Sequence, residues 1–145
     1  MLITLEQLNN TISSMFLSAQ LVDAGWDDLS NDDKMTVLNN ANAEFNRLQW
    51  IGKKVSATQA DAFPRILYEE IVETPDVVRY AIAEYCLNYT RLMTNETLAE
   101  LRKGLTSEKV GPISNNYSLE QALKTAKTYN KYLVDWIYRG GGYRG

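Results

Sequence analysis

The stretch FPRILYEEIVETPDVVRYAIAEYCLNYTRL, residues 63–92, decides the fold, because it holds a strong start signal for a long and mostly apolar helix. Thr74 is a good N-cap and Pro75 suits the first helical position, where the N–H that proline lacks would have no intrahelical acceptor. The apolar residues that follow recur at helical spacing and cover one broad face: Val77, Val78, Ala81, Ile82, Tyr85, Tyr89 and Leu92. We therefore expect this helix to be the core of the chain or part of an assembly interface.

The composition is that of one soluble globular domain with a real core. The chain has 145 residues, of which 45% are hydrophobic and 23% charged. A net charge of −3 argues against a protein whose main task is to coat nucleic acid. The charge is unevenly spread, with an acidic first third and a basic C-terminal end. These two regions either pair neighbouring copies head to tail or form solvated surfaces.

The chain lacks most of the residues that enzymes and metal sites commonly use. Histidine is absent, and the single Cys86 lies within the apolar helix, where we expect it to be buried. No nucleotide-binding glycine loop occurs. The acidic cluster of residues 27–33 lacks the alternating spacing and the glycine of a calcium loop. We expect no enzyme, no cofactor and no metal site, and, because no apolar run is long enough to span a bilayer, no membrane segment.

Caps predict three further main helices. Capping boxes open helices at about residues 5–17 and 118–138, and Ser30 caps a helix that ends before Gly52. Residues 18–29 look like a connection, with Gly25 as a breaker and Trp26 as an apolar anchor. The asparagines at 39, 40, 42 and 46 should lie largely off the apolar stripe of the Ser30 helix.

The remaining segments should be shorter or irregular. A short helix is expected from residue 94 or 95 to 103, and residues 105–117 should be extended, as one strand or a small hairpin. Residues 66–73 should form a polar loop. The fold class is therefore mostly α: a small bundle of about four main helices with a short extended or β segment near 105–117. We expect a helical domain over residues 1–138 and a flexible glycine-rich arm over 139–145.

Tyrosines and lysines on the helices leave two interpretations open. Tyr80, Tyr85, Tyr89, Tyr129 and Tyr132 could stack on single-stranded nucleic acid, although tyrosine at helical spacing is more often core or subunit interface. A lysine stripe on the last predicted helix is either a solvated face or a contact to an acidic surface of another subunit. The stripe consists of Lys124, Lys127 and Lys131.

The order of several short motifs along residues 4–138 resembles a known family. The motifs are Trp26 with Leu29; Lys34 and Leu38; Leu48 with Gly52-Lys53; Gln59-Ala60; Phe63-Pro64-Arg65; Thr74-Pro75; Val77-Val78, Ala81 and Glu84-Tyr85; residues 107–113; and Tyr117-Ser118. This order is similar to that of the head-tail connector adaptors, or head completion proteins, of tailed bacteriophages. Related sequences also carry the label of putative DnaT-like single-stranded DNA-binding proteins.

The resemblance implies a structural virion protein. Such adaptors form a homo-oligomeric ring, usually of twelve copies, which docks on the portal protein, extends the DNA channel and offers a surface to the next neck or tail protein. Packaged DNA passes through without sequence-specific binding. The location would be the virion neck, at the head-tail junction, with assembly in the host cytoplasm.

The resemblance also implies roles for particular residues. The portal-binding arm maps to Trp136, Tyr138, Arg139, Tyr143 and Arg144. The structural motif is Phe63, Pro64, Arg65 and Pro75, in which Phe63 is buried, Pro64 fixes an extended turn, and Arg65 braces a carboxylate in the same or an adjacent subunit. A DNA contact by Arg65 is the less favoured alternative. Subunit or partner interfaces would use Tyr85, Tyr89 and the lysine stripe.

The alternative function is a single-stranded DNA-binding module. It requires a basic groove with exposed aromatic side chains and a salt-dependent affinity, and the acidity of the chain counts against it. An enzyme ranks third.

Overall fold

The computed structural model describes residues 1–94 and 128–137. In chain order, the elements of this part are α1 (Leu5–Met15), α2 (Ser18–Ala24), α3 (Asn31–Asn46), β1 (Lys53–Lys54), β2 (Arg65–Leu67), β3 (Glu70–Val72), α4 (Asp76–Thr94) and the 3₁₀ helix η1 (Thr128–Tyr132). The prediction of a mostly α domain is confirmed. The predicted short helix to residue 103 and the extended segment 105–117 lie outside the described residues.

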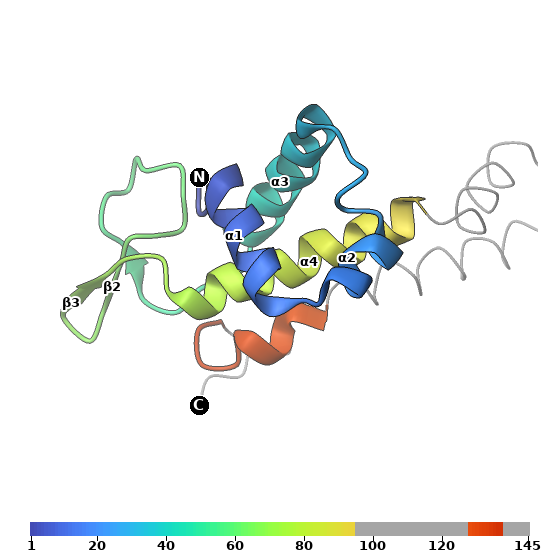
Figure 1. Ribbon diagram of the computed structural model, residues 1–145. Coiled ribbons are helices and arrows are strands. Elements are labelled where there is room, and N and C mark those ends of the chain that lie inside the picture. The colour runs from blue at the N-terminus through green and yellow to red at the C-terminus, as the bar shows by residue number, and fades with distance from the viewer. Residues whose placement is uncertain (95–127, 138–145) are drawn as a thin grey trace, which may run out of the picture.

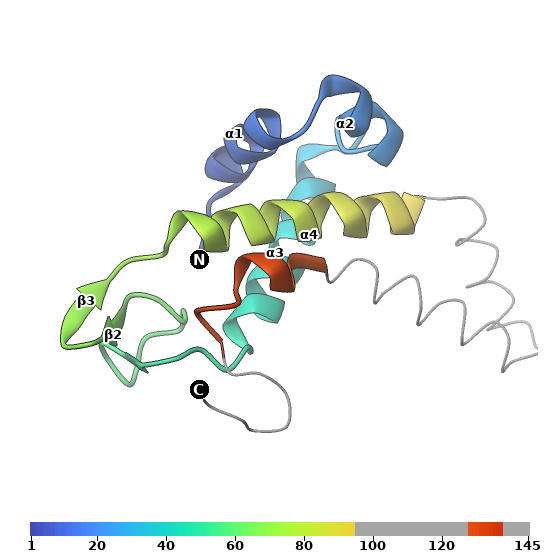
Figure 2. The same cartoon turned by 90° about the horizontal axis from the view of Figure 1, so that it is seen from below.

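Helix α4 is the centre of the fold, which is one of the two roles that its sequence left open. It contacts α1, α2, α3 and η1, and the two perpendicular views show these elements arranged around it (Figure 1, Figure 2). Its middle turns are inaccessible to solvent on almost every side, because Val78, Ala81, Ile82 and Cys86 have no exposed surface. The helix begins one residue later than predicted, and the Pro75 carbonyl accepts hydrogen bonds from the N–H groups of residues 78 and 79.

The predicted caps at Thr4 and Ser30 are confirmed, but the predicted connection after α1 is wrong. Thr4 and Gln7 form the capping box of α1. Residues 18–24, predicted to be a connection, form α2, in which only Leu21 and Ala24 are buried. So short a helix has too few apolar positions to show a clear period in the sequence. Gly25 ends it in the left-handed region at φ 82°, which glycine adopts without strain.

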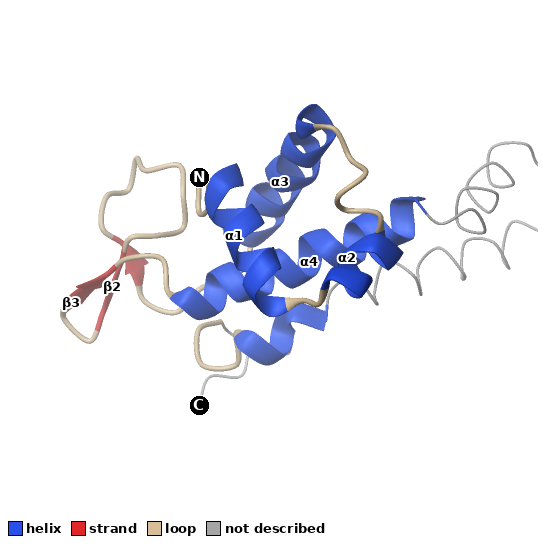
Figure 3. Cartoon of the chain, in the orientation of Figure 1, coloured by secondary structure: helices blue, strands red, loops and turns tan. Residues whose placement is uncertain are grey.

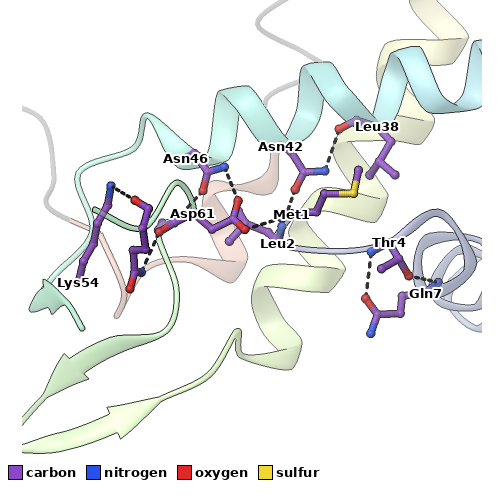
Figure 4. Close-up of polar contacts among 11 residues, drawn as sticks. Met1, Leu2, Thr4, Gln7, Leu38, Asn42, Asn46, Lys54 and Asp61 are labelled. Atoms are coloured by element: carbon purple, nitrogen blue, oxygen red, sulfur yellow. Dashed lines mark hydrogen bonds and ion pairs between the residues drawn. The ribbon is translucent and has the colours of Figure 1, made fainter. Parts of the chain in front are cut away.

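Helix α3 places one asparagine inside the core, against prediction. Ser30 caps the helix, and Val37, Leu38, Ala41 and Phe45 form the predicted buried stripe. Asn42 is only 7% exposed, and its Oδ1 accepts a hydrogen bond from the N–H of Leu2 at 2.8 Å, while its Nδ2 donates to the Leu38 carbonyl at 3.1 Å (Figure 4). These two bonds replace the water that the amide loses on burial, which is why a polar side chain is tolerated there.

A second polar contact fixes the loop between β1 and β2 to α3. The Nδ2 of Asn46 donates to Asp61 at 3.1 Å, and its Oδ1 accepts from the N–H of Ala62 at 2.8 Å. The N-terminal amino group of Met1 also contacts Asp61 (Figure 4). Asn46 therefore connects the last turn of α3 to the residues that lead into β2.

A three-stranded antiparallel sheet stands where a polar loop was predicted. The strand order is β1-β2-β3, with Lys53 opposite Ile66 in the first pair and Leu67 opposite Glu70 in the second. Figure 3 shows the β2–β3 hairpin at the end of the molecule where α4 begins. Three-residue strands are shorter than the window in which alternation can be recognised, so the sequence did not reveal them.

The last described segment is not the α-helix that was predicted to run to residue 138. It is a 3₁₀ helix through Tyr132, followed by turns and an antiparallel bridge between Trp50 and Ile137. The N–H of Ile51 donates to the Trp136 carbonyl at 2.9 Å, a bond that a continuing helix could not offer. The predicted apolar face is nevertheless partly correct: Tyr129 and Leu133 are buried, and Tyr129 contacts Phe45 with ring centroids 4.5 Å apart.

The described ranges, residues 1–94 and 128–137, lack two features. They contain no helix of the length and hydropathy needed to cross a bilayer. They also contain no group of three or more cysteine or carboxylate side chains that could hold a metal ion.

Candidate interaction site

The β2–β3 hairpin is held to the helical body by Arg65, which is only 8% exposed. Its guanidinium donates to the main-chain carbonyl oxygens of Ile51 at 2.8 Å, Ala62 at 3.0 Å, Gly52 at 3.0 Å and Trp50 at 3.3 Å. Arginine suits this task because its planar fork presents five N–H groups in fixed directions. The predicted bracing role is seen, and these four acceptors are carbonyl oxygens of the adjoining loops, whereas the prediction named a carboxylate.

Aromatic rings fix the last described segment beside the hairpin. Phe63, 4% exposed, lies between Trp50 at 5.0 Å and Trp136 at 6.1 Å, measured between ring centroids. The Trp50 Nε1 donates to the Phe45 carbonyl at 2.8 Å, so the indole also reaches the end of α3. Phe63, Pro64 and Arg65 thus act together at one place: Phe63 fills the core, the Phe63–Pro64 peptide is cis, and Arg65 gathers the surrounding carbonyls.

The turn of the hairpin carries two residues in a strained conformation. Tyr68 has φ 51° and Glu69 has φ 70°, and both positions of such a two-residue turn normally favour asparagine or glycine. Tyr68 is also 91% exposed, the highest value among the large apolar side chains of the described ranges. A strained, exposed aromatic residue at a protruding turn contributes little to folding, which points to a role in contact with another molecule.

A groove of about 380 Å³ opens between the hairpin and the C-terminal segment. Leu67, Glu70 and Val72 lie on one face of the two strands, since Leu67 pairs with Glu70 and Val72 is two residues further along β3. The lining consists of Ile51, Leu67, Tyr68, Glu70, Val72, Asp135 and Trp136. The groove is therefore an apolar channel with one carboxylate on each side, because Glu70 comes from β3 and Asp135 from the segment opposite.

Tyr85 and Tyr129 are buried, although both belong to the predicted stacking set, the five tyrosines that could stack on nucleic acid. Tyr85 is 7% and Tyr129 is 3% exposed, and both rings contact Phe45. The Tyr129 hydroxyl donates to Glu44 at 2.9 Å. Burial, and the nearby Glu44 carboxylate, raise the pKa of Tyr85 to about 12 and raise that of Tyr129 as well. These rings are core residues. Tyr89 stacks on Tyr85 at 5.9 Å and is partly buried.

A smaller aromatic and cationic patch is exposed where α4 meets η1. Tyr80, 39% exposed, contacts Tyr132 edge to face at 6.5 Å, and the Lys131 ammonium lies 5.2 Å from the centre of the Tyr132 ring. Lys131 also pairs with Glu84 at 2.9 Å, and this hydrogen bond raises the pKa of Lys131. The carboxylate offsets the one cation of this patch, so the patch offers aromatic surface with little net positive charge.

Several predicted site residues lie outside the described residues. These are Tyr138, Arg139, Tyr143 and Arg144 of the arm, and Lys124 and Lys127 of the lysine stripe. Trp136, predicted to belong to the arm, packs against Phe63 and lines the groove. Pro75 lies at the start of α4, and Lys131 is exposed.

Sequence reasoning did not find the groove. The sequence places Glu70 in the predicted polar loop of residues 66–73 and does not single out Tyr68 or Asp135. The available signal is the run Ile66 to Val72, in which two pairs of apolar residues flank Tyr-Glu-Glu and no glycine occurs. Nothing in the sequence shows that residue 135 lies opposite residue 70, because that depends on how the chain returns to the body.

The described residues form a small, mostly α domain with a short antiparallel sheet. A model of the family described as "Putative DnaT-like ssDNA binding protein" matches residues 9–144, and the chain belongs to this family. The description agrees with the second label of the predicted resemblance and makes no mention of a head-tail adaptor. No curated protein and no solved structure matches the chain.

Proposed function

We propose that the protein is a structural adaptor of a tailed-phage neck, in which copies form a ring on the portal protein and receive the next neck or tail protein. The observation that carries the proposal is the hairpin with its groove. A strained turn, an exposed Tyr68 and an apolar channel are arranged on a rigid support, and this arrangement suits protein docking.

The charge of the described body supports an assembly role over nucleic-acid binding. Residues 1–94 and 128–137 carry fourteen Asp and Glu against eight Lys and Arg, a net charge of −6. Such a surface repels phosphate, as the wall of a conduit for DNA should, whereas binding by counterion release needs a basic face. The remaining residues carry a net charge of +3, which suits contact with an acidic body in a head-to-tail ring.

In this proposal the portal is contacted by the arm, with Arg139, Tyr143 and Arg144 as anchors. Trp136 supports the arm from the body, since its ring packs on Phe63. A ring of about twelve copies, a location at the head-tail junction, and a non-enzymatic role belong to the same proposal. A chain that orders a short arm on a partner groove offsets the entropy of ordering by the interface gained.

Single-stranded DNA binding is the second candidate, and the family description favours it over the adaptor. Among the described residues, the patch of Tyr80, Lys131 and Tyr132 is where bases could stack. Its cation is paired with Glu84, and Tyr85 and Tyr129 of the predicted stacking set are buried. These features weaken the site that this function needs.

One pair of measurements separates the two candidates. Electron microscopy of the full-length protein mixed with the portal encoded nearby in its genome tests the ring. A titration with single-stranded DNA at about 150 mM salt tests the alternative, because non-specific phosphate contacts are weakened there. A ring on the portal without DNA affinity supports the adaptor. No ring, together with DNA binding that Tyr80→Ala and Lys131→Ala abolish, overturns it in favour of DNA binding.

A further inference from the structure

We infer that the groove between the β2–β3 hairpin and residues 135–136 binds an extended segment of a partner protein that carries an arginine or lysine between apolar residues. The identity of that partner as the next neck or tail protein rests on the proposed function. The chemistry of the segment rests on the groove alone.

The lining of the groove selects for this chemistry. Ile51, Leu67, Val72 and Trp136 supply apolar surface, which gains free energy when an apolar side chain displaces water from it. Glu70 and Asp135 stand on opposite sides, and both are exposed. An entering cation would lie between two carboxylates that come from different elements, whereas an acidic segment would be repelled from both sides.

The hairpin also favours an extended partner. Within the described residues β3 pairs only with β2, so it is an edge strand of the sheet. An extended segment can add to such an edge through main-chain hydrogen bonds while alternate side chains enter the groove. β3 is three residues long, so the added segment would be short, with one or two side chains in the channel.

The strained turn fits the same role. Tyr68 lines the groove, yet its ring is almost fully exposed, so it has an unused face for a guest side chain. An arginine between the carboxylates would also be able to stack on this ring. The left-handed conformation of Tyr68 and Glu69 is thereby explained as the backbone geometry that keeps the aromatic side chain at the opening.

A peptide titration on the full-length protein tests the inference directly. The probe is the blocked hexapeptide Val-Thr-Arg-Thr-Val-Thr, in which the two valines and the arginine share one face of an extended chain, and its control has glutamate in place of arginine. Binding is followed by NMR through the methyl groups of Ile51, Leu67 and Val72, at peptide concentrations up to about 1 mM, where weak peptide binding is measurable. We expect these methyl signals to shift with the arginine peptide and not with the glutamate peptide.

Two variants locate the charge effect. Glu70→Gln with Asp135→Asn should weaken binding of the arginine peptide about fivefold, the combined effect of two exposed ion pairs. Glu69→Gln is the matched control, because Glu69 lies on the same turn without lining the groove, and it should leave the affinity within about twofold. Absence of methyl shifts, or equal binding of both peptides, overturns the inference.

The portal assay separates this inference from the proposed function. If the double variant still forms rings on the portal but no longer recruits the next neck or tail protein, both stand. If its rings recruit that protein as the wild type does, the groove inference fails and the adaptor stands. If the wild type forms no ring, the adaptor fails, and the peptide titration alone decides the groove.

Discussion

Replacing Arg65 by alanine should lower the free energy of unfolding more than replacing any other charged residue of the described ranges by alanine. The side chain donates four hydrogen bonds, of 2.8 to 3.3 Å, to carbonyls in two loops. Each hydrogen bond to a charged group contributes about 1.5–3 kcal/mol to stability. The four share one side chain and some carbonyls would regain water, so we expect a total loss of about 3–5 kcal/mol.

Equilibrium unfolding in urea measures this loss. A chain of this size has a free energy of unfolding of about 7–15 kcal/mol, so the variant should still fold. Its urea midpoint should fall by roughly 2 M for a typical denaturant slope. Arg65→Lys should recover less than half of the loss, because an ammonium group cannot reproduce the planar fork.

Arg47→Ala is the matched control for charge removal. Arg47 pairs with Glu44 at 2.9 Å, but its side chain is 72% exposed, so its loss should cost less than about 0.5 kcal/mol. Hydrogen exchange should accelerate at residues 50–54 and 65–72 in Arg65→Ala only. A loss below about 1 kcal/mol for Arg65→Ala, or equal losses in the two variants, would refute the bracing role.

Three further changes test other parts of the structure. Gly52→Ala should lower the free energy of unfolding by about 2–4 kcal/mol, measured in a thermal or urea melt. Gly52 has φ 75°, and an added Cβ would stand 2.4 Å from the Ile66 carbonyl oxygen. A neutral effect would show that this close approach is not present. Stability should fall above pH 10, because the unfolded phenol of Tyr85 ionises near 10 while its folded pKa is about 12; Tyr85→Phe should therefore reduce the slope of unfolding free energy against pH by up to about 1.4 kcal/mol per unit between pH 10 and 12, and an unchanged slope would contradict the burial. The double variant Tyr68→Asn with Glu69→Gly should increase the free energy of unfolding by about 0.5–1 kcal/mol and so raise the melting temperature, because both residues suit the left-handed turn. It should also weaken peptide binding in the groove. A lower melting temperature would argue against turn strain.

The helical framework could be predicted because its signals are local. A capping box at Thr4 and Gln7, a cap at Ser30 and the apolar run after Pro75 each act within a few residues of where they occur. The central position of α4 followed from its apolar circumference alone. The same local reasoning singled out Gly25 as a breaker, although it did not predict the helix that Gly25 ends.

The predictions that were wrong concern residues whose structure depends on contacts with distant parts of the chain. Asn42 is buried because the N–H of Leu2 reaches it, and no window around residue 42 contains that information. The end of the last segment turns away from helix because residues 50 and 51 offer it main-chain hydrogen bonds. Both outcomes are tertiary effects that override a correct local preference.

The candidate site was less predictable than the fold for the same reason. The burial of Phe63 and a bracing role for Arg65 are what the family resemblance implies, although the acceptor that it implied was a carboxylate. The groove could not, because its two carboxylates lie 65 residues apart in the chain and meet only through the return of residues 133–137. The turn at Tyr68 and Glu69 carries no glycine, so its sequence does not show a hairpin.

The burial of Tyr129 and Leu133 makes the timing of synthesis matter. The ribosome releases α1 to α4 long before it releases these two residues, so the emerging chain leaves the surface of Phe45 that Tyr129 contacts uncovered. The same residues precede Trp136, without which the groove has only its hairpin wall. A nascent chain therefore completes the groove only after residues 1–94 have left the ribosome, when Trp136 supplies the wall opposite the hairpin.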